Sequence, residues 1–347
     1  METLRWIADE RLLYGLLGGL STTYLLIIIA ISIILLWRGA DWMIEGVVVF
    51  AERTGLPKIV IGATIVSLGT TTPEAFVSVM AAWMGNPGLA LGNGVGSIIA
   101  DTALIFGITC ILSRVPVDRY ILNRTGIVQV GVATLLVAIS LIAWGTMPGQ
   151  PVLDRWVGGL FLVLLAAYLY LTYFWSQKRS ILETAHELPE RGESASAVKS
   201  LFMIMGGLFL VITGARMLVP SSVEIAGRIG VPEDIIAATL VALGTSLPEL
   251  VTAIAAVRKG HPEITVGNIV GADVLNCLFV IGASAVTRPL VISANFFTFH
   301  FPAMLIVLFS FRAFIVINKD GWFKKWQGVW LLGIYVGYII LQYVMNI

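Results

Sequence analysis

Apolar residues run along this chain in long segments that are separated by short polar stretches. An α-helix needs about twenty apolar residues to cross the hydrocarbon layer of a membrane. Ten segments are close to that length or longer, so the pattern predicts ten membrane-spanning helices. They lie at roughly 21–50, 57–84, 88–112, 125–146, 152–175, 199–228, 231–258, 262–287, 293–313 and 326–345.

One polar stretch, 176–198, is longer than the others and holds four glutamates among lysines and arginines. We interpret it as a cytoplasmic linker, because it is too short to fold as a domain of its own. It divides the chain into a first five-helix half at 21–175 and a second at 199–347. Residues 1–20 form a short segment that we expect to lie outside the cytoplasm.

The two halves repeat each other at a fixed offset of 175 residues. The run G-L-P-K-I-V-I-G-A-T-I-V-S-L-G-T-T-T-P-E, from Gly55 to Glu74, corresponds to G-V-P-E-D-I-I-A-A-T-L-V-A-L-G-T-S-L-P-E, from Gly230 to Glu249. Nineteen of the 53 positions in 55–107 are identical to their counterparts in 230–282. Five spans are an odd number, so the second copy enters the membrane with opposite polarity. The sequence therefore predicts an all-α polytopic membrane protein made of two inverted-topology five-helix repeats.

Composition and charge narrow the class of protein and its partners. The chain is 58% hydrophobic and 12% charged, which excludes an ordinary soluble domain. Its net charge of +1 argues against a nucleic-acid partner. With the amino terminus outside, the inner loops hold fifteen basic residues and the outer segments five, a bias that predicts both termini outside the cytoplasm of a plasma (inner) membrane. The inner set is Arg53, Lys58, Arg114, Arg119, Arg124, Lys178, Arg179, Arg191, Lys199, Arg258, Lys259, Arg312, Lys319, Lys324 and Lys325.

Each repeat carries a glutamate into an apolar span, Glu74 in the first and Glu249 in the second. A carboxylate there is costly unless it faces a cavity, a cation or a partner. A single acid could be half of a structural ion pair with an arginine. Two acids at equivalent positions favour a cation site instead.

Residues beside the glutamates supply further oxygens. Pro73 lacks a backbone N–H and should free the carbonyl of Gly69, as Pro248 should free that of Gly244. A hydroxyl four residues before each glutamate shares its helix face. Carboxylate, hydroxyl and carbonyl oxygens form a set that suits a hard cation such as calcium or sodium, although the hydroxyls could instead bond their own helix backbone. The hydroxyl residues are Thr70, Thr71, Thr245 and Ser246.

A glycine-rich motif follows each glutamate, at 91–101 and 266–276. Ser97 and Asp101 share one helix face, and Asp101 is a third acid within the membrane. Asn276 supplies a neutral oxygen at the position equivalent to Asp101. Asp273 has no acidic counterpart in the first copy, and it could be a ligand, a proton acceptor or a group oriented toward a polar loop. The glycines could serve close helix packing alone.

The remaining polar residues receive structural interpretations. We expect the charged residues of the first and sixth spans to pair with one another or to lie near the membrane surface. These are Arg38, Asp41, Glu45, Arg216 and Glu224. Cys110 and Cys277 lie inside apolar runs and are interpreted as small buried side chains.

Together, the paired motifs G-T-T-T-P-E and G-T-S-L-P-E, each followed by G-N-x-x-G, resemble the two α-repeats of the sodium/calcium exchangers in the cation/calcium exchanger superfamily. The similarity extends over nearly the whole chain. It implies ten helices in two inverted halves, and antiport of sodium against calcium by alternating access. It also implies a transporter rather than an enzyme, with inorganic cations as its partners, lipid as its surroundings, and no cofactor or obligate protein partner.

The resemblance also implies particular ligands. The calcium ligands of the family fall on Glu74 and Glu249. The other sodium and calcium ligands fall on Thr70, Thr71, Ser97, Asp101, Thr245, Ser246 and Asn276, with backbone carbonyls at Ser67 and Ala242.

Three departures from the family pattern leave the coupling ion open. The acid and the amide occur as Asp101 and Asn276, whereas the reverse order is familiar, and the exchange preserves the charge of the site. Ala272 stands where a serine hydroxyl is expected, and Asp273 where asparagine is usual.

Two alternatives to sodium/calcium antiport therefore remain. A desolvated carboxyl group can exchange a proton for a cation, so proton-coupled transport of calcium is the first. An intramembrane hydrolase with paired acids is a remote second, since the chain lacks a G-x-G-D motif.

Overall fold

The computed structural model describes residues 18–147, 149–184, 197–230, 244 and 246–345. Within them, eight helices are long and apolar enough to cross a membrane, and a bent pair at 58–70 and 72–83 makes a ninth. The predicted span at 231–258 can be followed only from its second half, because 231–243 and 245 lie outside the described residues.

The helices and strands follow one another along the chain with few irregular residues between them. In the first half they are α3 (Thr22–Thr54), α4 (Lys58–Ile61), η1 (Gly62–Val66), α5 (Ser67–Thr70), α6 (Thr72–Trp83), α7 (Pro87–Ile99), η2 (Ala100–Ile105), α8 (Phe106–Leu112), α9 (Arg119–Thr146), β1 (Val152–Leu153) and α10 (Arg155–Thr184). In the second half they are α11 (Ala197–Arg228), α14 (Leu247–Arg258), α15 (Pro262–Leu275), η4 (Asn276–Ile281), α16 (Gly282–Thr287), β2 (Leu290–Val291), η5 (Phe296–His300), α17 (Phe301–Ile317) and α18 (Lys325–Met345).

Most predicted helix boundaries agree with the structure to within a few residues. The largest differences lie at 125–146, where α9 already begins at Arg119, and in the predicted linker, where α10 continues to Thr184. Asp118 explains the earlier start of α9, because its side chain accepts hydrogen bonds from the backbone N–H groups of Tyr120 and Ile121. An N-cap of this kind begins a helix before its apolar stretch does.

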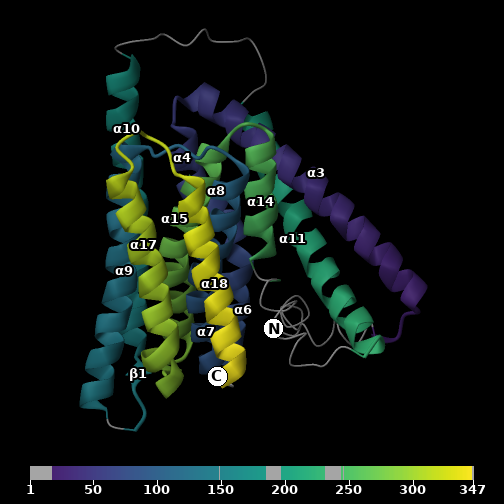
Figure 1. Ribbon diagram of the computed structural model, residues 1–347, viewed down its shortest axis with the longest axis vertical. Helices are drawn as coiled ribbons and strands as arrows, with labels where there is room; N and C mark the ends of the chain where they lie inside the picture. Colours follow the sequence, from purple (N-terminus) through teal and green to yellow (C-terminus); the bar gives the residue numbers. More distant parts are fainter. Residues whose placement is uncertain (1–17, 148, 185–196, 231–243, 245, 346–347) are drawn as a thin grey trace.

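Most helices form one upright bundle, and its apolar core runs from α7 and α8 through α9, α15 and α17 (Figure 1). Large apolar side chains also cover the outside of the molecule, such as Phe202 and Val344, which are 74% and 72% exposed. An exterior of this kind is stable in lipid rather than in water.

A pair of long helices, α3 and α11, lies beside the bundle, slants away from it, and packs mainly against itself (Figure 1). A Cβ atom at Gly39 would lie 2.6 Å from the carbonyl oxygen of Gly207, and one at Gly46 would lie 2.8 Å from that of Ser200. Residue numbers rise along one helix as they fall along the other, so the two run antiparallel. Glycine permits this approach because it has no Cβ.

The α3–α11 crossing obeys the repeat offset. Gly214 corresponds to Gly39, and Ser32 corresponds to Gly207. A Cβ atom at Gly214 would lie 2.9 Å from the carbonyl oxygen of Ser32, just as Gly39 meets Gly207. A self-complementary contact of this kind is the mark of a two-fold relation.

Turns of π-helix interrupt the third span of each repeat at nearly equivalent positions. They are η2 at Ala100–Ile105 and η4 at Asn276–Ile281, which starts one residue later than the offset of 175 requires. Such turns widen the helix locally and recur at functional sites. Both follow directly on the glycine-rich motifs singled out in the sequence.

Short strand pairings join the two halves. Val152 and Leu153 of β1 pair antiparallel with Val291 and Leu290 of β2. An isolated bridge joins Pro116 to Trp322. Each pairing connects a loop of one half to a loop of the other.

Candidate cation site

The first predicted helix break lies where the sequence places it. The segments at 58–70 and 72–83 meet at an angle of 42°, with Pro73 in the first turn of α6. Glu74 follows directly and is 1% exposed, and Thr70 and Thr71 are fully buried. A carboxylate and two hydroxyls therefore gather at one bend inside the molecule.

The second break repeats this arrangement as far as it can be followed. Pro248 and Glu249 lie in the first turn of α14, and Ser246 precedes that helix. Glu249 is 1% exposed and Ser246 is 3% exposed. The predicted ligands Thr245 and Ala242 lie outside the described residues.

Asp101 and Asn276 meet each other between the two breaks. They are separated by the repeat offset of 175, and the Nδ2 of Asn276 lies 3.4 Å from the Oδ2 of Asp101. Two equivalent residues can touch only near the axis that relates their repeats. Ser97, one turn before Asp101 on α7, is 4% exposed.

The carboxylates of the two repeats face a common region. Glu74 lies within electrostatic range of Glu249 and Asp101. Asp101 in turn is close to Glu249 and to the hydroxyl of Ser246, and Glu249 is close to that of Thr70. The structure thus brings together acids that are far apart in sequence.

Oxygen atoms without a hydrogen-bond donor are concentrated in this region. Among the described residues, no group donates to Glu74 Oε2, Glu249 Oε2, Asp101 Oδ1 or Asn276 Oδ1, and the hydroxyls of Thr71, Ser97 and Ser246 have no partner. Buried acceptors of this kind are rare and call for an ion or ordered water. Within the described part of the chain, no three His, Cys, Asp or Glu side chains converge tightly enough to hold one metal ion. Hydroxyl, amide or backbone oxygens would have to complete its coordination.

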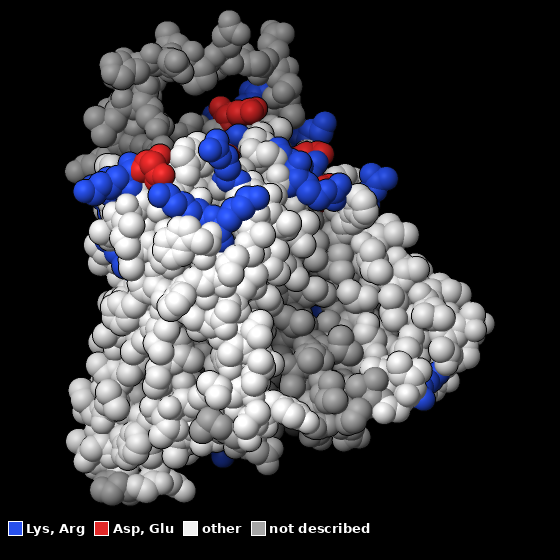
Figure 2. Space-filling view, in the orientation of Figure 1, with Lys and Arg blue, Asp and Glu red and all other residues white. Residues whose placement is uncertain are grey.

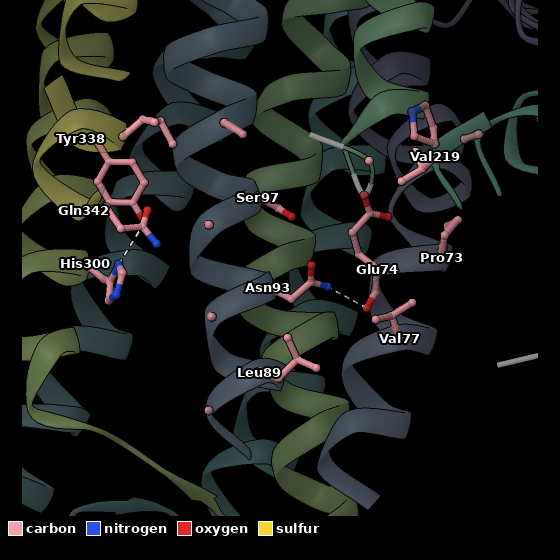
Figure 3. A pocket seen from close by; sticks show the side chains of 18 of the residues that line it. Pro73, Glu74, Val77, Leu89, Asn93, Ser97, Val219, His300, Tyr338 and Gln342 are labelled. Carbon is pink, nitrogen blue, oxygen red and sulfur yellow. Dashed lines mark hydrogen bonds between the residues drawn. The ribbon is translucent and has the colours of Figure 1, made fainter. Parts of the chain in front are cut away.

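A cavity of about 460 Å³ leads to Glu74. Figure 3 shows Glu74, Asn93 and Ser97 on one part of its wall, with His300, Tyr338 and Gln342 across from them. The Nδ1 of His300 lies 2.9 Å from the hydroxyl oxygen of Tyr338. The side chain of Glu74 is therefore buried, yet it borders open space.

Of the predicted site residues, those that the structure describes are all buried around the two breaks. The backbone carbonyl of Ser67 accepts the N–H of Thr71 at 2.9 Å and the hydroxyl of Thr70 at 3.4 Å, so a cation there would take the place of the Thr70 hydroxyl. The roles of these residues in holding an ion remain predictions. The buried set is Glu74, Glu249, Asp101, Asn276, Thr70, Thr71, Ser246, Ser97 and Ser67.

Sequence reasoning did not assign a role to several polar residues around the site. Asn93 donates to the backbone carbonyl of Glu74 at 3.3 Å and to the hydroxyl of Ser78 at 2.9 Å, so it braces the bend. Asn268, its counterpart, accepts from Thr70 at 3.4 Å. Their identity across the repeats was the available signal. Gln129 and Thr102, described below, are single polar residues in apolar spans.

Three charged residues of the first and sixth spans form ion pairs. Lys259 pairs with Glu45 at 2.8 Å and with Asp41 at 3.8 Å, and Glu224 pairs with Arg228 at 2.9 Å. These three therefore pair with residues outside the predicted set rather than with one another. Arg216 lines the cavity. Cys110 and Cys277 are free and buried, as expected.

A family model described as "Sodium/calcium exchanger protein" matches the chain twice, at residues 24–174 and 199–344. The two matches begin 175 residues apart, which is the repeat offset. Sodium/calcium exchanger MaX1 of Methanosarcina acetivorans is 27% identical over 91% of this chain and 98% of its own length. Inner membrane protein YrbG of Escherichia coli is 30% identical over 91% of this chain and 96% of its own length.

A similar solved structure is that of the sodium-calcium exchanger NCX_Mj soaked with 2.5 mM Na⁺ and 10 mM Sr²⁺. It is 25% identical to this chain in sequence, with a TM-score of 0.77. The alignment covers 92% of this chain and 99% of that one.

Proposed function

The chain belongs to the sodium/calcium exchanger family, and on that premise we propose that it exchanges sodium for calcium at one buried site between its two repeats. Members of this family are transporters rather than enzymes, so the hydrolase alternative is set aside. The relatives named above are multi-pass membrane proteins that span nearly the same length.

The juxtaposition of Glu74, Glu249 and Asp101 is the observation that carries this proposal. These acids are buried and within electrostatic range of one another. Moving a charged carboxylate from water into the protein interior costs on the order of several kcal/mol. A divalent cation, or several monovalent ones, offsets that cost. We therefore assign calcium to the oxygens of Glu74 and Glu249, with Asp101, Asn276 and the surrounding hydroxyls shared between calcium and sodium.

Competition for shared oxygens would couple the two fluxes without a chemical step. A site occupied by calcium leaves few ligands for sodium, and the reverse also holds. Alternating access then requires a moving part. The α3–α11 pair is a candidate because its apolar residues belong to a smaller cluster, shared with residues of α4, η1, α14 and α15, that is separate from the main core. Sliding of packed helices is a known mode of domain movement.

Two inverted repeats of five spans are our proposed topology. The antiparallel, self-complementary crossing of α3 and α11 supports it, as does the meeting of Asp101 with Asn276. The paired family matches support it as well. Completing ten spans requires a helix that begins within 231–243 and continues into α14.

We propose an orientation in an inner membrane in which both termini lie outside the cytoplasm. On the face drawn in Figure 2, Lys and Arg side chains gather at the upper end and few occur at the lower end. Basic residues favour the cytoplasmic side. The similar YrbG is described as an inner membrane protein.

Flux in proteoliposomes tests the proposal. Sodium-loaded vesicles diluted into sodium-free buffer should accumulate ⁴⁵Ca²⁺, and Glu74→Gln or Glu249→Gln should abolish the accumulation. Glu52→Gln, which removes an exposed carboxylate at the end of α3, is the matched control and should leave the flux unchanged. Normal flux in either buried-site variant would remove those residues from the site.

Proton-coupled calcium transport is the second candidate, favoured by Asp273. This fourth acid is buried near the others, beside Ala272, which has no hydroxyl to offer sodium. A pH gradient in sodium-free buffer separates the candidates. Calcium uptake under that gradient alone favours proton coupling, and uptake that requires a sodium gradient favours sodium.

A further inference from the structure

Asp273 of α15 belongs to a buried polar cluster that the proposed exchange does not use. The hydroxyl of Thr102 on η2 donates to its Oδ2. The Nε2 of Gln129 on α9 donates to the same oxygen at 2.5 Å. We call these three residues the Asp273 cluster. All three are at most 1% exposed, so three separate helices direct polar groups to one point in the apolar core.

The Asp273 cluster joins the two repeats, because Asp273 comes from the second and Thr102 and Gln129 come from the first. The repeat offset of 175 relates Asp273 to Ile98 and Thr102 to Cys277. Both counterparts are buried in the apolar core. The same fold therefore packs well with apolar residues at these places, and packing alone does not require the polar ones.

Two acceptor oxygens of the cluster receive no hydrogen bond from the described part of the chain. Two donors converge on Oδ2 of Asp273, which is the arrangement expected for an ionised carboxylate. Asp273 Oδ1 and Gln129 Oε1 receive no donor from any described residue. Buried oxygens without a donor call for an ion or an ordered water, and a buried ionised carboxylate calls for a compensating positive charge.

The chemistry of the donors indicates which cation would fit. The free atoms are oxygens, which suit hard ions rather than soft metals. The cluster carries one formal negative charge, which a monovalent ion neutralises. It adjoins the main site, since Thr102 follows Asp101 directly in sequence and Asp101 lies within electrostatic range of Asp273.

We propose that Asp273, Gln129 and Thr102 hold a monovalent metal cation, which is sodium in the exchange proposed above, in a subsite beside the one that Glu74 and Glu249 form. The subsite rests on the proposed exchange function, because it would add a sodium ion to the transported set. It would also replace the hydroxyl that Ala272 lacks. The repeat-related positions Ile98 and Cys277 carry no carboxylate or hydroxyl, so the subsite would have no symmetry-related copy.

Equilibrium binding of ²²Na⁺ and ⁴⁵Ca²⁺ to the purified full-length protein in detergent tests the subsite. Asp273→Asn keeps the shape of the side chain and introduces the residue that the family resemblance suggests here. A triple variant, Thr102→Cys with Gln129→Met and Asp273→Ile, replaces the three polar side chains by apolar ones, and Cys and Ile are the residues at the repeat-related positions 277 and 98. Ser140→Ala, which removes a buried hydroxyl elsewhere on α9, is the control.

We expect Asp273→Asn and the triple variant each to bind one sodium ion fewer per chain than the wild type. Their calcium affinity should stay within about threefold, because Glu74 and Glu249 are intact, and the control should match the wild type in both. Equal sodium counts in Asp273→Asn and wild type, with calcium binding retained, would overturn the subsite and leave the exchange function standing. The proposal is also overturned if sodium counts are equal and Asp273→Asn only alters proton uptake, because the cluster then holds a proton. Wild-type protein that binds neither ion would overturn both proposals.

Discussion

Replacing Gly207 by alanine should weaken the crossing of α3 and α11. The added Cβ would lie 2.5 Å from the carbonyl oxygen of Gly39 and 2.6 Å from the backbone nitrogen of Met43. Both atoms belong to the backbone of α3, so no side-chain rotation can relieve the contact and the helices must separate. Over-packing of this kind costs about 1–3 kcal/mol.

Gly206, the neighbouring residue on α11, provides the control. A Cβ atom there would meet nothing within 4 Å. Both substitutions gain the same intrinsic helix preference of alanine over glycine, roughly 0.5–1 kcal/mol. That gain cancels when the two variants are compared. The free energy of unfolding of Gly207→Ala should therefore fall about 1–3 kcal/mol below that of Gly206→Ala.

The comparison is made by denaturant unfolding of the two purified variants in the same detergent, followed by tryptophan fluorescence. Gly214→Ala should resemble Gly207→Ala, because its Cβ would lie 2.9 Å from the carbonyl oxygen of Ser32. Equal stability of Gly206→Ala and Gly207→Ala would refute the close antiparallel crossing, and with it one of the supports for inverted repeats.

Further predictions concern the site and its surroundings. Asp101→Asn should reduce sodium-driven calcium flux at least tenfold. The double variant Asp101→Asn with Asn276→Asp should recover most of the flux, because these equivalent residues touch and the exchange restores the charge. A double variant as inactive as the single one would count against that symmetry. Lys259→Gln should change the free energy of unfolding by no more than about 1 kcal/mol, since its ion pairs are partly exposed; a larger loss in thermal or denaturant unfolding would contradict this. Leu89 is 59% exposed and lines the cavity, so Leu89→Cys should react with an impermeant maleimide added outside. The wild type should stay unlabelled, because Cys110 and Cys277 are buried. Labelling of the variant only from the inside would reverse the proposed orientation.

The sequence predicted the helices well because long apolar runs have few alternatives in a membrane. It also singled out the buried acid Glu74, because the repeat displays it again as Glu249. The contact between Asp101 and Asn276 was not predicted, because the sequence shows that the two are equivalent but not that they lie beside each other.

The Asp273 cluster could not be predicted in the same way. Its three members come from separate helices, and the repeat conceals them because their counterparts are apolar. Gln129 is a lone polar residue between Val128 and Val130, and nothing local indicates that it reaches Asp273. The early start of α9 depends on its N-cap, and α10 continues as a helix beyond its apolar stretch, so hydrophobicity alone predicted neither boundary.

The central claim is that Glu74 and Glu249 share one calcium site between the two repeats. Counting bound ⁴⁵Ca²⁺ per chain in the wild type, in Glu74→Gln and in Glu249→Gln tests it most directly. A shared site predicts one calcium ion in the wild type and none in either variant at the same free calcium concentration. Two ions in the wild type and one in each variant would mean that the glutamates act separately, which would contradict the account.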